Sequence, residues 1–67
     1  MKISLNKPNI KTINHFGEIK EYNQCEYVCV YDKFIIVQTK SGTHCLYKNQ
    51  FMRIEIQFRK GSEWLNI

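Results

Sequence analysis

Alternating apolar and polar residues mark the segment 52–58. Every second residue in it is apolar, and the residues between them are charged or carry an amide. A period of two places successive side chains on opposite faces of a strand, and a single apolar face is typical of a strand half buried in a core. The pattern therefore predicts a strand over 52–58. Its apolar face carries Met52, Ile54, Ile56 and Phe58, and its other face carries Arg53, Glu55 and Gln57.

Two further apolar segments, 26–31 and 34–39, are separated only by Asp32 and Lys33. A two-residue gap suits a tight β-hairpin, and Asp tolerates the positive φ that such turns need. Once this loop is fixed, the register of the two strands is fixed with it. The predicted facing pairs are Tyr31 with Phe34, Val30 with Ile35, Cys29 with Ile36, Val28 with Val37 and Tyr27 with Gln38.

Both faces of this hairpin are apolar. The aliphatic face, expected to meet Ile54, Ile56 and Phe58 in the core, carries Val28, Val30, Ile35 and Val37. The aromatic face carries Tyr27, Cys29, Tyr31, Phe34 and Ile36. Two explanations of the aromatic face are open: another part of the chain covers it, such as the N-terminal segment or the tail around Trp64, or it is an exposed patch of the kind that marks an interface.

The rest of the chain divides into shorter elements. They are a hairpin turn at 40–42, a strand over 43–48, a 3₁₀ turn over 48–51, two strands over 10–13 and 18–22, and a tail over 61–67 that folds back. The loop length at Gly42 decides the side of Tyr47: a three-residue loop puts it on the aliphatic face, and a two-residue loop puts it on the aromatic face. The order of elements predicts one all-β domain over 1–67, either a small antiparallel barrel of SH3-like layout or a strongly curled open sheet.

Composition supports this fold class and limits the compartment. The chain has 67 residues, contains no alanine, and is rich in β-branched and aromatic residues, which argues against a helical bundle. Its longest apolar run, 34–37, is far shorter than a membrane span, and the start of the chain lacks the apolar stretch of a signal peptide. Three cysteines cannot form an even disulfide framework. We therefore expect a soluble, cytoplasmic protein with reduced thiols and no membrane partner.

The residues that suggest chemistry are Cys25, Cys29, His44 and Cys45. Zinc needs four converging ligands, but neighbouring side chains in a strand point to opposite faces, so His44 and Cys45 cannot readily share an ion. The same geometry argues against a Cys–His nucleophile pair. The six carboxylates are scattered, and no glycine-rich phosphate motif is present. We expect no metal, no cofactor and no catalytic residues, and hence a protein that is not an enzyme.

The net charge of +4 and the interspersed aromatic residues favour a binding module. Cations that neutralise phosphates and rings that stack on bases are typical of proteins that bind single-stranded nucleic acid. The alternative is a small modulator or inhibitor, of the type encoded by phages or mobile elements, that docks on a partner protein through its aromatic face or a sheet edge. A homodimer through the aromatic face is compatible with either. The predicted binding residues are Tyr27, Tyr31, Lys33, Phe34 and Arg53.

Overall fold

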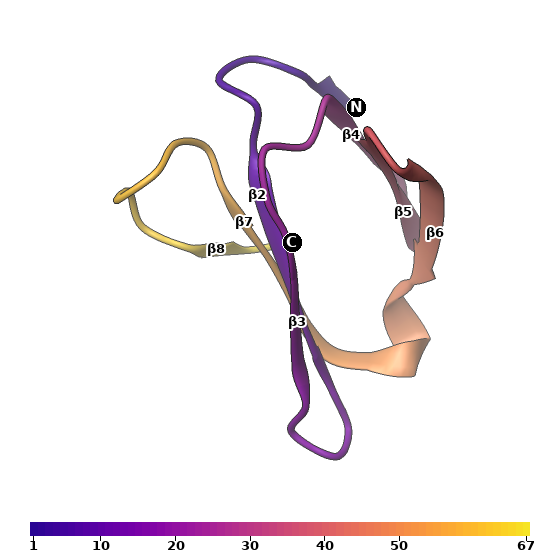
Figure 1. Cartoon of the computed structure of the whole chain (residues 1–67). Coiled ribbons are helices and arrows are strands. Elements are labelled where there is room, and N and C mark those ends of the chain that lie inside the picture. Colours follow the sequence, from indigo (N-terminus) through magenta and orange to yellow (C-terminus); the bar gives the residue numbers. More distant parts are fainter.

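The computed structural model describes all residues 1–67 and divides eight strands between two four-stranded antiparallel sheets (Figure 1). The order in the first sheet is β1 (Lys2–Ile3), β4 (Tyr27–Val30), β5 (Phe34–Thr39) and β6 (Gly42–Tyr47). In the second sheet it is β3 (Ile19–Tyr22), β2 (Asn9–Asn14), β7 (Phe51–Gln57) and β8 (Leu65–Asn66). A single turn of 3₁₀ helix, η1 (Lys48–Gln50), joins β6 to β7 and so connects the two sheets.

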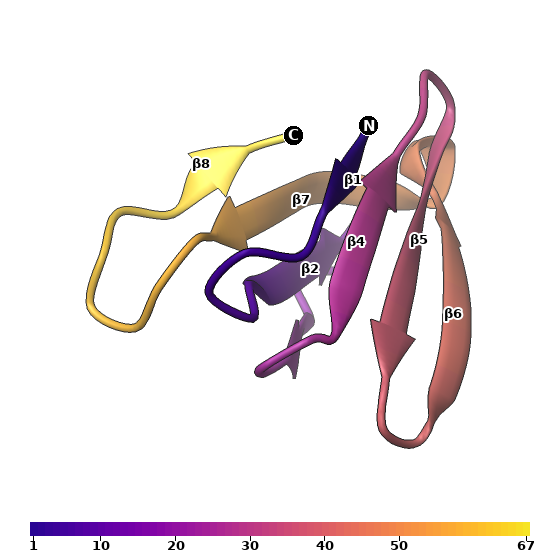
Figure 2. The same cartoon turned by 90° about the horizontal axis from the view of Figure 1, so that it is seen from above.

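The all-β prediction is confirmed, but the strands do not close into a barrel. Strands β1 and β6 are the edges of the first sheet, and β3 and β8 are the edges of the second, with no pairing between the sheets. Viewed from above, β1, β4, β5 and β6 lie side by side, and β7 crosses behind them (Figure 2). The only helix, η1, is three residues long, so the structure has no helix of the length and apolar character that crossing a bilayer requires.

The predicted register of the first hairpin is confirmed from Tyr27 opposite Gln38 to Val30 opposite Ile35. At the second hairpin, Thr39 faces Gly42, so the loop has two residues. Gly42, the first residue after this loop, has a φ of 138°, a backbone conformation that favours glycine. This loop length settles the open question about β6, because it places Tyr47 opposite Phe34 on the aromatic face.

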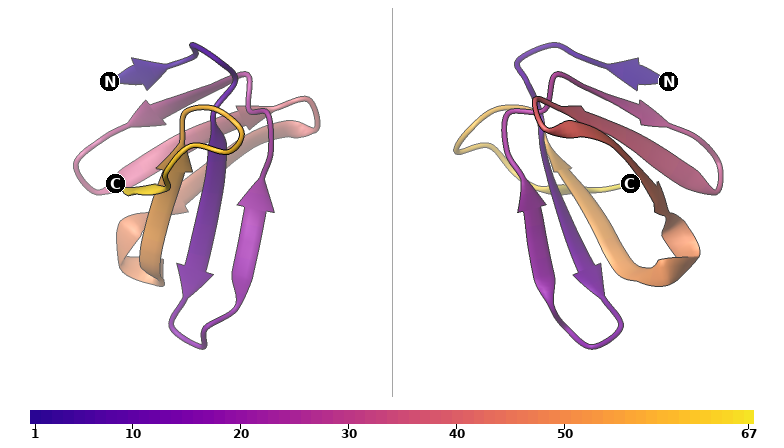
Figure 3. Two further views of the ribbon diagram at one scale, coloured as in Figure 1. Left: turned by 90° about the vertical axis from the view of Figure 1, so that its left-hand side faces the viewer. Right: turned by 45° about the vertical axis from the view of Figure 1, so that its right-hand side comes forward.

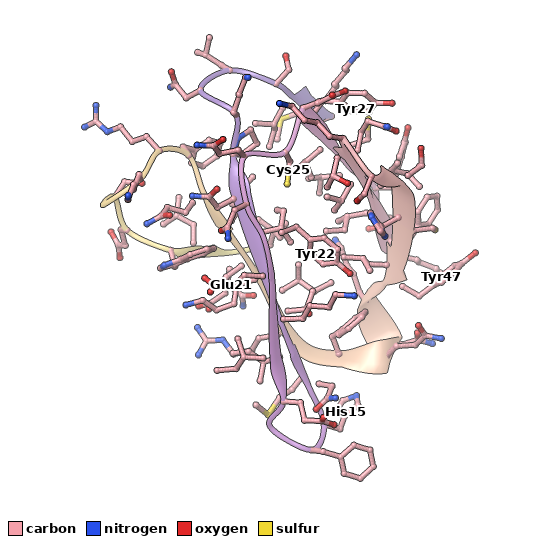
Figure 4. The ribbon with its side chains drawn as sticks, viewed as in Figure 1. His15, Glu21, Tyr22, Cys25, Tyr27 and Tyr47 are labelled. Atoms are coloured by element: carbon pink, nitrogen blue, oxygen red, sulfur yellow. The ribbon has the colours of Figure 1, made fainter.

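The core lies between the facing sides of the two sheets. Its eight buried residues are Ile10, Cys25, Val28, Ile35, Val37, Leu46, Ile54 and Ile56. Figure 4 shows the side chains of Tyr22 and Cys25 pointing into this space. Val30 was expected to be largely buried and is half-buried instead, packing at the margin of the core.

The prediction for the apolar face of β7 is wrong at both ends of the strand. The register against β2 shifts between Ile13 and Asn14, which leaves Met52 without a facing residue. Such a bulge reverses the side on which the preceding residues point. Met52 is accordingly 56% exposed, and Phe51 packs against the core in its place. Phe58 lies beyond the end of β7 and is also exposed.

The tail folds back as predicted and pairs with β7 as β8, where Asn66 faces Glu55 and Leu65 faces Ile56. The β7–β8 loop projects outward from the second sheet, as the right-hand view of Figure 3 shows. It helps to bury the polar side of β7, where Gln57 Nε2 donates a hydrogen bond to the Ser62 carbonyl at 2.8 Å. Residues 54–57 are therefore all buried, although alternate ones are polar. The tail thus lies with the second sheet and leaves the aromatic face of the first sheet uncovered.

Candidate functional site: an exposed aromatic cluster

Three aromatic side chains gather on the outer side of the first sheet. The rings of Tyr31 and Phe34 are stacked, with centroids 4.9 Å apart and 28° between planes. Tyr47 lies on the other side of Phe34, at 5.7 Å and 47°. Tyr31 is 48% exposed and Tyr47 is 50% exposed, while Phe34 between them is half-buried. We call Tyr31, Phe34 and Tyr47 the aromatic cluster.

Local hairpin geometry holds the aromatic cluster together. The Tyr31 N–H donates to the Phe34 carbonyl at 3.0 Å, which closes the β4–β5 turn and brings the two rings onto one side. Phe34 and Tyr47 are a facing cross-strand pair, a position in which aromatic side chains come into contact. Figure 4 shows Tyr47 directed away from the interior, on the far side of β6 from Tyr22.

Two lysines flank the aromatic cluster. The Lys48 N–H donates to the Lys33 carbonyl at 2.9 Å, so both lysines lie at the same end of the hairpin. Neither lysine forms a salt bridge. Together with Asp32, Asn49 and two rings of the cluster, they line an open hollow of about 460 Å³. This end of the sheet therefore combines exposed ring surface with two unpaired cations.

The predicted binding residues do not all lie at this site. Tyr31, Lys33 and Phe34 come together, but Tyr27 is at the other end of β4, about 13 Å along the strand at 3.3 Å per residue. The Lys2 ammonium lies 4.3 Å from the centre of the Tyr27 ring. Arg53 is on β7 of the second sheet, where its guanidinium Nη2 pairs with Glu55 Oε2 at 2.7 Å.

Tyr47 and Lys48 are the site residues that the sequence prediction missed. The position of Tyr47 followed from the loop length at Gly42, which the sequence left open between two and three residues. Lys48 follows Tyr47 directly and begins η1, so its placement depended on the same choice. No family model, no curated protein and no solved structure matches this chain. The geometry of the aromatic cluster and its lysines is therefore the observation that bears on function.

The cysteine and histidine side chains are dispersed. Cys25 is in the core, whereas Cys29 and Cys45 lie on the outer side of the first sheet with Ile36 of β5 between them. His44 faces the opposite way, with its ring 5.0 Å from that of Tyr22. It is half-buried, because the two-residue loop turns it toward the second sheet. No three His, Cys, Asp or Glu side chains converge on one point.

Burial raises the pKa of the Cys25 thiol above its ordinary value, although backbone hydrogen bonds from Cys25 and Ile10 oppose the shift. The thiol donates to the Tyr22 carbonyl at 3.3 Å. The thiol of the unfolded chain therefore loses its proton at a lower pH than the buried thiol of the folded chain. The contribution of the protonated thiol to stability is complete below the unfolded pKa, at a pH of about 8.5, and is lost as the pH rises through the folded pKa.

We therefore expect the free energy of unfolding to fall with rising pH more steeply in the native sequence than in Cys25→Ala. Urea unfolding at a series of alkaline pH values measures both slopes. Cys45→Ala is the matched control, because it removes an exposed thiol and keeps the buried Cys25. Equal slopes in the native sequence and Cys25→Ala would contradict the prediction.

Proposed function

We propose that the protein is a non-catalytic binding module whose aromatic cluster, with Lys33 and Lys48, binds single-stranded nucleic acid. The observation that supports this most is the uncovered row of three rings beside two unpaired lysines. Aromatic rings stack on bases regardless of sequence, and lysines neutralise the phosphates that link them. The partner is then held by stacking and charge, with no reaction step required of the module.

The fold and the charge are in keeping with this proposal. The formal net charge is +4, which favours an anionic partner over the whole surface. We propose that the elements β4, β5, β6, η1 and β7, which follow one another along the chain, have an SH3-like layout. Small five-stranded β-folds frequently carry nucleic-acid sites on their strands. A cytoplasmic location belongs to the same proposal, and three free cysteines support it.

Salt dependence tests the proposal directly. We expect a fluorescein-labelled single-stranded oligothymidylate to bind with an affinity that falls steeply between roughly 50 and 200 mM salt, as followed by fluorescence anisotropy. Lys33→Gln and Lys48→Gln should each lower the slope of log affinity against log salt by about 0.7, the value for one phosphate contact on a single strand.

Lys40→Gln is the matched control for the salt series. Lys40 is an exposed lysine in the β5–β6 turn, at the other end of β5 from the aromatic cluster, so its removal changes the net charge equally without removing a contact. A slope that drops as much in Lys40→Gln as in Lys33→Gln would contradict the site. Binding that does not respond to salt would contradict the nucleic-acid partner.

A protein partner is the second candidate, favoured by one observation. Strand β6 is an outer strand of six residues whose second edge is unpaired, and exposed Cys45 and Tyr47 lie on its outer face. A free edge of this kind accepts an added strand from another chain. Recovery of bound partners from lysate, with and without nuclease, separates the two candidates. A partner that binds the module directly as a protein is recovered after nuclease treatment, whereas one that binds through nucleic acid is lost.

A further inference from the structure

A second hollow, larger than the one beside the aromatic cluster, lies away from that cluster. It has a volume of about 810 Å³ and is open to solvent. Its walls come from the segment before β2, the segment after β3 and the loop between β7 and β8. Figures 1 and 3 show these three segments meeting at one end of the second sheet. Glu21 of β3, which borders the hollow, points to the outer side of this sheet in Figure 4.

The charge of this hollow is strongly positive. Lys7, Arg59 and Lys60 line it, and Glu21 is its only acidic residue. None of these four side chains forms a salt bridge, because the single salt bridge of the protein joins Arg53 and Glu55. Three cations from two separate loops are therefore brought together with only one acidic side chain, Glu21, in the same hollow. An anionic ligand would balance the remaining positive charge.

A network of amides holds the walls of the hollow in place. Asn9 Nδ2 donates to Gln57 Oε1 at 2.8 Å, and Asn9 Oδ1 accepts from the Gln24 N–H at 2.7 Å. Gln57 in turn donates through Nε2 to the Ser62 carbonyl, and only 8% of Gln57 is exposed. The two amide side chains thus tie all three wall segments to one another. A site held in this way is preorganised, so less ordering is needed when a ligand binds.

The backbone around the hollow is strained. Asn6, Lys7 and Gln24 have φ values of 64°, 46° and 51°, and they are the only residues other than glycine with positive φ. All three line the hollow. A lysine or glutamine in this region costs free energy, and such residues gather where a ligand needs a particular backbone shape.

Trp64, the only tryptophan of the chain, supplies the one aromatic wall. Its ring is half-buried, and the Lys11 ammonium lies 4.2 Å from the ring centre. Lys11 does not itself line the hollow, so it contacts the ring without occupying the space. An indole beside three cations and several amides offers a planar surface for a ring and charges for a phosphate.

We propose that this hollow binds a free nucleotide, with Lys7, Arg59 and Lys60 around the phosphate and Trp64 against the base. The inference goes beyond the proposed function, because the hollow and the aromatic cluster are built on different sheets and share no residue. A bare anion would not contact the indole, and an uncharged sugar would not pair with the three cations. A nucleotide makes both contacts, through its base and its phosphate.

Calorimetric titration of the full chain with AMP, adenosine and inorganic phosphate tests the assignment. We expect AMP to bind and the other two to bind at least about tenfold more weakly, because each supplies only one of the two interactions. The Trp64 indole N–H resonance should shift with AMP in a two-dimensional NMR spectrum. Phosphate binding as tightly as AMP, or AMP binding without a shift at Trp64, would overturn the proposal.

Charge variants locate the ligand. The double substitution Arg59→Gln with Lys60→Gln should weaken AMP binding by at least about tenfold, since two charge-assisted contacts are removed. Lys20→Gln with Lys40→Gln removes the same charge from residues outside the hollow and should change the affinity less than twofold. An equal loss in both doubles would show binding by overall charge and overturn the site.

Lys7→Gly separates the ligand contact from the stability of the fold. Glycine adopts a φ of 46° without strain, so this substitution should keep or raise the melting temperature while weakening AMP binding. Unchanged AMP binding would remove Lys7 from the site and contradict the proposal.

A trinucleotide with a 5′ phosphate provides the last comparison. If it binds more tightly than AMP and loses affinity in the Arg59/Lys60 double variant, the ligand is the end of a nucleic-acid strand. The free-nucleotide assignment would then be wrong.

Discussion

Ile56→Ala is expected to lower the free energy of unfolding by about 2–5 kcal/mol, the usual range for truncating a fully buried isoleucine. Ile56 is 1% exposed and lies between β2 and β8, facing Ile10 and Leu65. Natural domains have roughly 0.05–0.15 kcal/mol of stability per residue, which for this chain amounts to only about 3–10 kcal/mol. The variant should therefore be marginally folded or unfolded at 25 °C. Urea unfolding followed by Trp64 fluorescence and far-ultraviolet circular dichroism measures the loss.

Met52→Ala is the matched control on the same strand. Both residues are large and aliphatic, and the alternating pattern assigns them to one face, but the bulge in β7 turns Met52 out to solvent. Its truncation should change the free energy of unfolding by no more than about 0.5 kcal/mol. Losses of similar size in Ile56→Ala and Met52→Ala would contradict the bulge and restore the simple alternation.

Ile56 and Met52 show how far the alternation of apolar and polar residues predicts the buried face of β7. A two-residue loop and two apolar segments were enough to predict every facing pair between β4 and β5, because both features are local. The bulge at Met52 depends on how β2 aligns with β7, some forty positions away in the chain, and leaves no mark in the local pattern. The burial of Glu55 and Gln57 likewise depends on a tail that returns to pair with β7.

The predicted binding residues show the same difference between local and long-range effects. Tyr31, Lys33 and Phe34 lie within four residues of a tight turn, so the local hairpin alone brings them together. Arg53 was predicted to bind with them, but the crossing through η1 carries β7 into the other sheet. Tyr27 lies on the same face of the first sheet as the aromatic cluster, but at the opposite end of β4. Positions set within one hairpin could be predicted from the sequence, whereas positions that depend on how separate elements pack could not.

Tyr31→Ala and Tyr47→Ala are expected to weaken binding of single-stranded nucleic acid by roughly 5- to 150-fold each, which corresponds to about 1–3 kcal/mol per stacked base. Each ring is about half exposed, so truncation removes contact surface without opening a cavity in the core. Fluorescence anisotropy with the labelled oligothymidylate measures the affinity, and urea unfolding verifies that each variant is folded. Because both rings contact Phe34, the combined loss in the double variant is expected to differ from the product of the single losses.

Two further tyrosine variants decide what the aromatic cluster contributes. Tyr47→Leu keeps apolar bulk but removes the ring, so a stacking site should lose nearly as much affinity as in Tyr47→Ala, whereas an apolar docking site for a protein should lose little. Tyr27→Ala is the matched control, since Tyr27 lies on the same face about 13 Å away with Lys2 over its ring. A loss in Tyr27→Ala equal to that in Tyr47→Ala would show that the whole face binds, not the cluster. Full binding by Tyr47→Leu would remove base stacking at Tyr47 as the mechanism and favour a protein partner at this end of the first sheet.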